Sequence, residues 1–98
     1  GNSNIDYYLW PASFENVLSV AATDSLDQRW SGSSFGTSVD LTAPGDHVYS
    51  TWTYNGYFAS SGTSFSAPGV AGAAAIVLSH YPNLSALQLG EQMRVTAD

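Results

Sequence analysis

The segment from Val70 to His80 constrains this chain more than any other, because its residues are apolar or small on every side of the helix that they predict. A helix of this kind is surrounded by protein when it is folded. The remainder of the 98-residue chain predicts only short strands and one amphipathic helix, which are too few to cover it. We therefore expect the isolated chain to expose a large apolar patch.

Several short runs have the length and β-branching of strands. Residues 17–22 predict a strand buried on both faces, and residues 39–43 alternate until Pro44-Gly45 ends the pattern. Residues 48–53 and 57–59 predict a hairpin around Asn55-Gly56, a dipeptide that strongly favours a tight turn. The sequence therefore predicts a small sheet followed by a hairpin.

Two helices are predicted after the hairpin. The first begins near Ser64 and is stopped by Pro82. Ser85 and Gln88 have the spacing of a capping box, so a second helix is expected from about Ser85 to Arg94. Its expected apolar contacts are Leu84, Leu87 and Met93.

Charge and cysteine content exclude several classes of function. The chain has no cysteine, which leaves Ser, Thr or a carboxylate as the candidate nucleophile. Arg29 and Arg94 are its only fixed cations and the net charge is −6, so we expect no nucleic-acid partner.

The apolar run at 70–78 is too short to span a bilayer, and we expect no membrane partner. The first residues lack both a signal peptide and an initiator Met, so we expect the chain to begin within a longer protein.

Ser64 stands where the first helix is expected to begin, after Gly62 and before Pro68. The unpaired N–H groups of a first helical turn stabilise negative charge, so an oxyanion that formed beside Ser64 would be favoured. On position alone, the ordinary explanation of such a serine is a helix N-cap. The longer string around it decides between the two.

The string Ser61-Gly-Thr-Ser-Phe-Ser-Ala-Pro-Gly-Val-Ala-Gly72 resembles the nucleophile signature of the subtilase family of subtilisin-like serine proteases, peptidase family S8. Gly69 departs from the pattern, since many members carry His there, but that residue lies outside the triad. Further segments are similar to the family in order and spacing, so that the resemblance covers effectively all 98 residues: Trp10-Pro-Ala, Val17-Leu-Ser-Val-Ala-Ala, Trp30-Ser-Gly-Ser-Ser-Phe-Gly and Val39-Asp-Leu-Thr-Ala-Pro-Gly.

The resemblance implies an α/β class and a partial subtilisin-like fold. Mostly parallel strands would surround a buried central helix that begins near Ser64, with a hairpin beside them. Residues 1–98 would then form the C-terminal part of a catalytic domain that is truncated at both ends.

The resemblance also implies the site residues. Ser64 would be the nucleophile of a serine endopeptidase, and Asn2 would donate a hydrogen bond to the oxyanion, unless the terminal Gly-Asn is merely disordered. The peptide bond before Pro11 is expected to be cis. The residues expected to bind substrate are Leu9, Trp10, Gly62 and Thr63, with ordinary packing as an equal alternative for Leu9 and Trp10.

A serine hydroxyl needs a base, and the base needs an orienting carboxylate. In subtilases both precede the oxyanion Asn, so they are expected upstream of Gly1. His47 is expected in a solvated turn, and His80 lies about 24 Å from Ser64 at about 1.5 Å per helical residue, too far to act as its base. The chain alone is therefore predicted to be inactive, and its expected partners are a protein or peptide substrate and the upstream part of the same domain.

Cofactors and alternative functions complete the expectations. The carboxylates show no regular metal-ligand spacing and are assigned to solvated faces, so no metal site and no required cofactor are predicted. Calcium is possible in the complete family fold through carbonyls near Ala12, Phe14 and Val17, and secretion is implied by family habit. Two alternatives stay open: a non-catalytic subtilase-like binding module, and a self-sufficient Ser/Gly-rich recognition domain that would unfold cooperatively alone.

Overall fold

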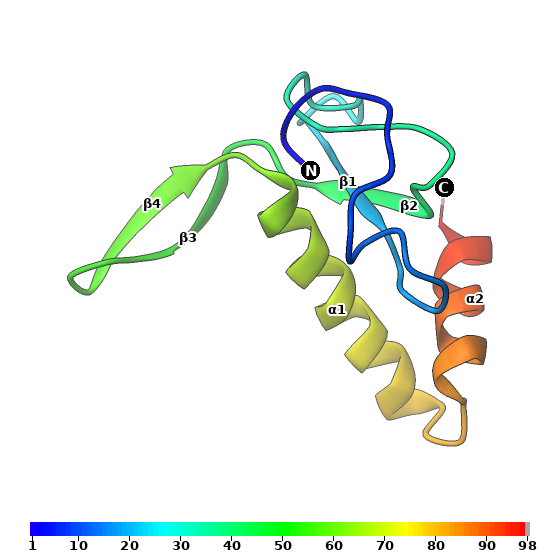
Figure 1. Cartoon of the computed structure of the whole chain (residues 1–98). Coiled ribbons are helices and arrows are strands. Elements are labelled where there is room, and N and C mark those ends of the chain that lie inside the picture. The colour runs from blue at the N-terminus through cyan, green and yellow to red at the C-terminus, as the bar shows by residue number, and fades with distance from the viewer. Residues whose placement is uncertain (98) are drawn as a thin grey trace.

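Residues 1–97 are described by a computed structural model, in which short strands precede two helices (Figure 1). The elements are β1 Val20–Thr23, β2 Leu41–Pro44, β3 Val48–Trp52, β4 Gly56–Ser60, α1 Thr63–His80 and α2 Ala86–Thr96. The predicted α/β class is confirmed, with one parallel strand pair and one antiparallel hairpin.

The parallel pair β1–β2 forms the centre of the structure. Its register pairs Val20 with Leu41, and Ala21 and Ala22 of β1 are buried. The sequence pattern finds this strand but places its start too early, at Val17 rather than Val20. The chain is still turning at Val17, whose N–H donates to the carbonyl oxygen of Phe14 at 3.2 Å. Figure 1 shows this pair beside the first turns of α1, which contacts both strands.

The hairpin β3–β4 projects from the rest of the chain (Figure 1). Its tip is centred on Tyr54 and Asn55, with φ of 57° and 58°, which is one residue earlier than the predicted Asn55-Gly56 turn. Gly56 instead pairs with Trp52 as the first residue of β4. Two aromatic pairs lie across the strands in this register: Tyr49 stacks on Tyr57 at 5.7 Å, and Trp52 lies tilted against Phe58 at 5.4 Å between ring centroids. Such cross-strand pairs favour the observed register.

α1 is buried only near its N-terminal end. Its buried residues are Thr63, Ser66 and Val70, whereas Ile76 is 64% exposed. β1, β2 and α2 contact this helix and leave much of its apolar surface open. The predicted exposed apolar patch is therefore confirmed. Within residues 1–97, neither helix combines the length and the apolar character that crossing a bilayer requires.

α2 begins with the predicted capping box. The Gln88 N–H donates to Ser85 Oγ at 3.2 Å, and the Ser85 N–H donates to Gln88 Oε1 at 2.9 Å. Leu84 and Met93 are half-buried, but Leu87 is 66% exposed. The predicted apolar contact of Leu87 is therefore wrong, because α2 packs against α1 and Leu87 lies outside the covered surface.

We expect the isolated 98-residue chain to bind apolar fluorescent dyes and to unfold gradually in denaturant. The physical reason is the uncovered surface of α1, which deprives the chain of a closed core. Dye fluorescence and circular dichroism during a urea titration measure the two properties. A sharp transition without dye binding would support the self-sufficient domain instead.

Candidate active site

Ser64 lies in the first turn of α1, and its side chain is exposed. The N-cap is Gly62, in an extended conformation, and no side chain caps the helix. The alternative role of Ser64 as an N-cap is therefore wrong. The Thr63 N–H binds Asn2 and the Phe65 N–H binds Gly62, whereas the Ser64 N–H makes no hydrogen bond within residues 1–97. This free donor lies at the positive end of the helix dipole, where negative charge is stabilised.

Asn2 reaches the start of α1 from the opposite end of the chain. The Thr63 N–H and the Thr63 hydroxyl both donate to Asn2 Oδ1 at 2.9 Å. A backbone N–H can only donate, so the atom facing it is the carbonyl oxygen of the amide, and Asn2 Nδ2 points the other way. The backbone nitrogen of Gly1 also donates to Thr63 Oγ1 at 3.1 Å. These contacts contradict the disordered alternative for Gly1-Asn2 and show that Thr63 orients the Asn2 side chain.

Gly62 separates Asn2 from Ser64. A Cβ atom added to Gly62 would stand 3.3 Å from Asn2 Nδ2 and 3.3 Å from Ser64 Oγ. The amide donor and the hydroxyl therefore face the same small volume, which only glycine leaves open. A peptide carbonyl bound beside this face of Gly62 would meet a nucleophile and a hydrogen-bond donor together.

Close contacts hold the start of α1 against the β1–β2 pair. Ser66 is fully buried, and its hydroxyl donates to the carbonyl oxygen of Ala43 at 2.9 Å. The Gly62 N–H donates to the carbonyl oxygen of Gly45 at 2.7 Å. A Cβ on Gly45 would overlap Ser66 Oγ and would stand 2.7 Å from Ala22 Cβ. Gly45 is thus required for the close approach of helix and sheet, as well as for the turn that the sequence indicates.

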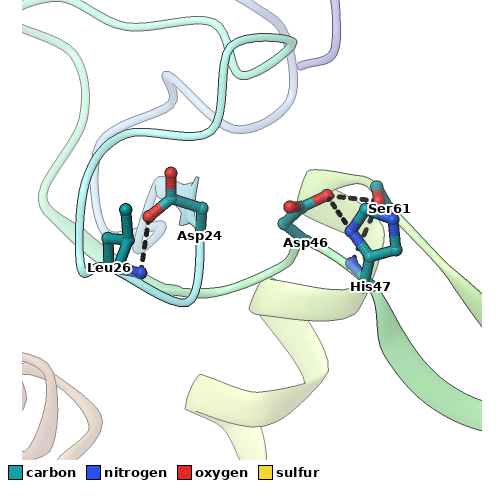
Figure 2. A network of polar contacts seen from close by, with 5 residues as sticks. All are labelled: Asp24, Leu26, Asp46, His47 and Ser61. Carbon is teal, nitrogen blue, oxygen red and sulfur yellow. Dashed lines mark hydrogen bonds and ion pairs between the residues drawn. The ribbon is translucent and has the colours of Figure 1, made fainter.

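A carboxylate lies beside this contact (Figure 2). The Ser61 hydroxyl donates to Asp46 Oδ1 at 2.5 Å, and His47 Nδ1 lies 2.9 Å from the same oxygen. These hydrogen bonds, above all the one from Ser61, hold the pKa of Asp46 below its ordinary value. The Asp46 side chain is 20% exposed, so it still reaches the surface, but its hydrogen bonds distinguish it from a freely solvated carboxylate.

Neither histidine is placed to activate Ser64. His47 has an 81% exposed side chain that pairs with Asp46, and its φ of 52° places it in a turn, as predicted. His80 Nδ1 lies 3.1 Å from the carbonyl oxygen of Ile76 in the last turn of α1. The described residues therefore provide position and hydrogen-bond donors for Ser64, but no general base.

The other expected substrate-binding residues lie in the first loop. Trp10 is 60% exposed, and its ring lies 6.4 Å from that of Tyr8 and 4.7 Å from that of Phe14. Leu9 is half-buried and packs against Gly1, next to Asn2. The Trp10–Pro11 peptide bond is cis, as expected. Contact of Leu9 and Trp10 with a substrate stays a prediction.

Metal binding leaves little trace in this part of the chain. Among residues 1–97, no three His, Asp or Glu side chains gather where they could hold a metal ion together. The Phe14 carbonyl lies in the region where the family resemblance allows a calcium site. Its oxygen accepts a hydrogen bond from the Val17 N–H at 3.2 Å. Calcium in the complete fold stays a prediction.

Sequence reasoning missed the residues that hold the site together. Ser61 and Ser66 lie within the recognised string, but a string does not reveal hydrogen-bond partners. Asp46 follows the turn at Pro44-Gly45, and its contact with Ser61 spans 15 positions of the chain. The one available signal for Asp46 was its place just after β2, a strand that packs on α1.

Comparison with known proteins agrees with this geometry. The model of the subtilase family matches residues 1–98. Subtilisin DY of Bacillus licheniformis is 47% identical over 88 residues, which are 90% of this chain and 32% of that protein. The thermostable alkaline protease of Halalkalibacterium halodurans is 41% identical over 97 residues, which are 99% of this chain and 27% of that protein. A crystal structure of a cold adapted subtilisin-like serine proteinase matches with a TM-score of 0.86 and 42% identity, covering 93% of this chain and 34% of that one.

The fold and the site thus define a segment of the subtilisin-like serine protease class. The chain belongs to the subtilase family. It spans about a third of the length of the relatives that it matches.

We expect Gly45→Ala to lower the helix content of the 98-residue chain, because overpacking of a tight contact costs about 1–3 kcal/mol. Gly72→Ala is the matched control, since its added Cβ meets nothing within 4 Å. Alanine favours a helix by up to about 1 kcal/mol over glycine, so this variant should raise the helix content. Circular dichroism at increasing urea measures both. Equal behaviour of the two variants would contradict the close approach at Gly45.

Proposed function

We propose that this chain is the segment of a serine endopeptidase that supplies the nucleophile Ser64 and the oxyanion donor Asn2. One observation carries the proposal: Ser64 Oγ and Asn2 Nδ2 lie equally close, at 3.3 Å, to the open position above Gly62. The free Ser64 N–H at the start of α1 adds a second donor on the same turn. A nucleophile between two preorganised donors suits acyl transfer from a peptide carbonyl.

The reaction follows from these groups. Ser64 Oγ attacks the carbonyl carbon of the peptide bond while a base accepts its proton, and the negative charge moves to the carbonyl oxygen. Asn2 Nδ2 and the Ser64 N–H donate hydrogen bonds to that oxygen. Collapse of the intermediate breaks the C–N bond, the leaving amine takes the proton from the base, and Ser64 stays acylated. Water, activated by the same base, then hydrolyses the ester. Neither step needs a cofactor.

The base and its orienting carboxylate belong, in this proposal, to a part of the catalytic domain outside residues 1–98. What supports this is the placement of both histidines: His47 is paired with Asp46, and His80 is at the far end of α1. The uncovered surface of α1, including Ile76, offers a place for that part to pack.

We further propose a protein or peptide substrate and an extracellular site of action, in keeping with the family.

A chimera tests the function directly. Residues 1–97 replace the matching segment of the thermostable alkaline protease of Halalkalibacterium halodurans, which supplies the rest of the domain. We expect the chimera to hydrolyse a peptide substrate and Ser64→Ala to abolish turnover, because no other group can form the acyl-enzyme. We expect the 98-residue chain alone to show no appreciable hydrolysis.

Two outcomes of that assay would contradict the proposal. A folded chimera that binds substrate without turnover would support the non-catalytic binding module. Turnover by the 98-residue chain alone that is lost in Ser64→Ala would show that the chain carries its own base. Ser79→Ala is the matched control for the chimera, since Ser79 Oγ contacts Ile76 O and His80 Nδ1 in the last turn of α1, at the end of the helix opposite Ser64.

The open position above Gly62 gives a second test in the same chimera. We expect Gly62→Ala to lower kcat, because its Cβ would stand 3.3 Å from both the nucleophile and the oxyanion donor and would displace them. Asn2→Ala sets the scale: in subtilisin, the protein for which that magnitude is established, loss of one oxyanion donor costs about two to three powers of ten in turnover. Steady-state kinetics measure both variants. Unchanged turnover in Gly62→Ala would place the reacting carbonyl elsewhere.

A further inference from the structure

The loop after β2 is hydrogen-bonded to Ser61 and Gly62, the two residues that precede α1. The Gly62 N–H donates to the carbonyl oxygen of Gly45 at 2.7 Å, and the His47 N–H donates to Ser61 Oγ at 3.0 Å. The same Ser61 hydroxyl donates to Asp46 Oδ1 at 2.5 Å. Ser61 therefore both donates to this loop and accepts from it, so its hydroxyl is fixed in direction (Figure 2).

Asp46 is the charged member of this group. Hydrogen bonds to an ionised carboxylate are stronger than those between neutral groups, and the 2.5 Å length of this one fits that class. His47 Nδ1 lies 2.9 Å from the same carboxylate oxygen, but the His47 ring is largely exposed and solvent screens this pair. Ser61 is thus the partner through which Asp46 acts on the polypeptide chain.

The path from Asp46 to the nucleophile is short. Ser61 is followed by Gly62, whose carbonyl oxygen accepts the Phe65 N–H at 3.0 Å in the first turn of α1. Ser64 lies inside that turn, and Gly62 borders the volume that it shares with Asn2. A shift of Ser61 would therefore move Gly62 and change the position of Ser64 Oγ relative to Asn2 Nδ2.

We propose that Asp46 is a positioning residue for Ser64, which holds the start of α1 in register with Asn2 through its hydrogen bond to Ser61. Asp46, His47 and Ser61 together form what we call the Asp46 clamp. The inference rests on the proposed function for its catalytic consequence, but the clamp itself is a contact between two loops. Asp46 does not touch the reacting atoms.

The carboxylate keeps its charge under ordinary conditions. Hydrogen bonds from Ser61 and from His47 lower the pKa of Asp46, so its ionised form persists as the pH falls below the usual range for Asp titration. A lowered folded-state pKa means that the clamp's contribution is fully present above the unfolded-state pKa. It is lost as the pH falls through the lowered value.

The test uses the chimera with the alkaline protease and three variants. We expect Asp46→Asn and Ser61→Ala to lower kcat about three- to tenfold with KM changed less than twofold, below the hundredfold loss that a 1 Å misplacement can produce. Asp46→Asn should be the milder, because its amide oxygen still accepts from Ser61. Asp24→Asn is the matched control: Asp24 Oδ1 accepts from the Leu26 and Gln28 N–H groups in a turn away from α1 (Figure 2).

Amide hydrogen exchange in the same proteins measures the stability of the Asp46 clamp independently of catalysis. The His47 and Gly62 amides should exchange faster in Asp46→Asn and Ser61→Ala than in Asp24→Asn. Unchanged kcat in the Asp46 and Ser61 variants, or losses matched by Asp24→Asn, would overturn the proposal. Unprotected His47 and Gly62 amides in an active chimera would overturn it too. An inactive chimera whose amides respond as expected supports the clamp and contradicts the proposed function alone.

Discussion

The close approach of α1 to the β1–β2 pair is the contact on which the rest of the structure depends. It is made by small residues, since Ala22 and Ser66 are fully buried and Gly45 leaves no room for a side chain between helix and sheet. Burial of a hydroxyl is unfavourable unless it is hydrogen-bonded, and Ser66 Oγ binds the carbonyl oxygen of Ala43. The contact therefore has a defined direction as well as a defined distance, which larger apolar side chains alone would not supply.

The same use of buried serines extends to the loop that carries Asn2. Ser33 is fully buried, and its hydroxyl accepts from the Ala22 N–H at 3.0 Å. The neighbouring Ser34 N–H donates to the carbonyl oxygen of Gly1 at 2.7 Å. Arg29 adds a hydrogen bond to Asn4 Oδ1 at 3.0 Å. One strand, β1, thus contacts α1 and also binds the loop whose Ser34 N–H holds Gly1, next to Asn2.

The sequence predicted the elements and pointed to Ser64 as the candidate nucleophile because those features are local. Ser85 and Gln88 lie within one turn of α2, and the string around Ser64 is continuous. The parts that sequence reasoning misplaced depend on contacts between distant positions. The hairpin tip lies at Tyr54 and Asn55, in a register that brings aromatic side chains of the two strands together, and Leu87 is left exposed by the limited extent of α1–α2 packing.

The candidate site shows the same division. Ser64 and Asn2 were found through residue type and a family string, and the structure then brings them together around Gly62. The role of Thr63 in orienting Asn2 joins residues 61 positions apart, and Asp46 meets Ser61 across 15 positions. No periodicity encodes such pairs. Only the register of β2 against β1, together with the turn at Gly45, places Asp46 beside the start of α1.

The contacts that position the candidate nucleophile Ser64 are separate from the group that would activate it. The contacts that fix Ser64, from Ser66, Gly45 and Asn2, all lie at the first turn of α1 and are complete within residues 1–97. The opposite half of α1, where Ile76 is exposed, makes none of them. The contacts that define where Ser64 and Asn2 meet therefore do not depend on that half of the helix. In the proposed function, the described residues supply the geometry of attack, and the proton acceptor comes from elsewhere.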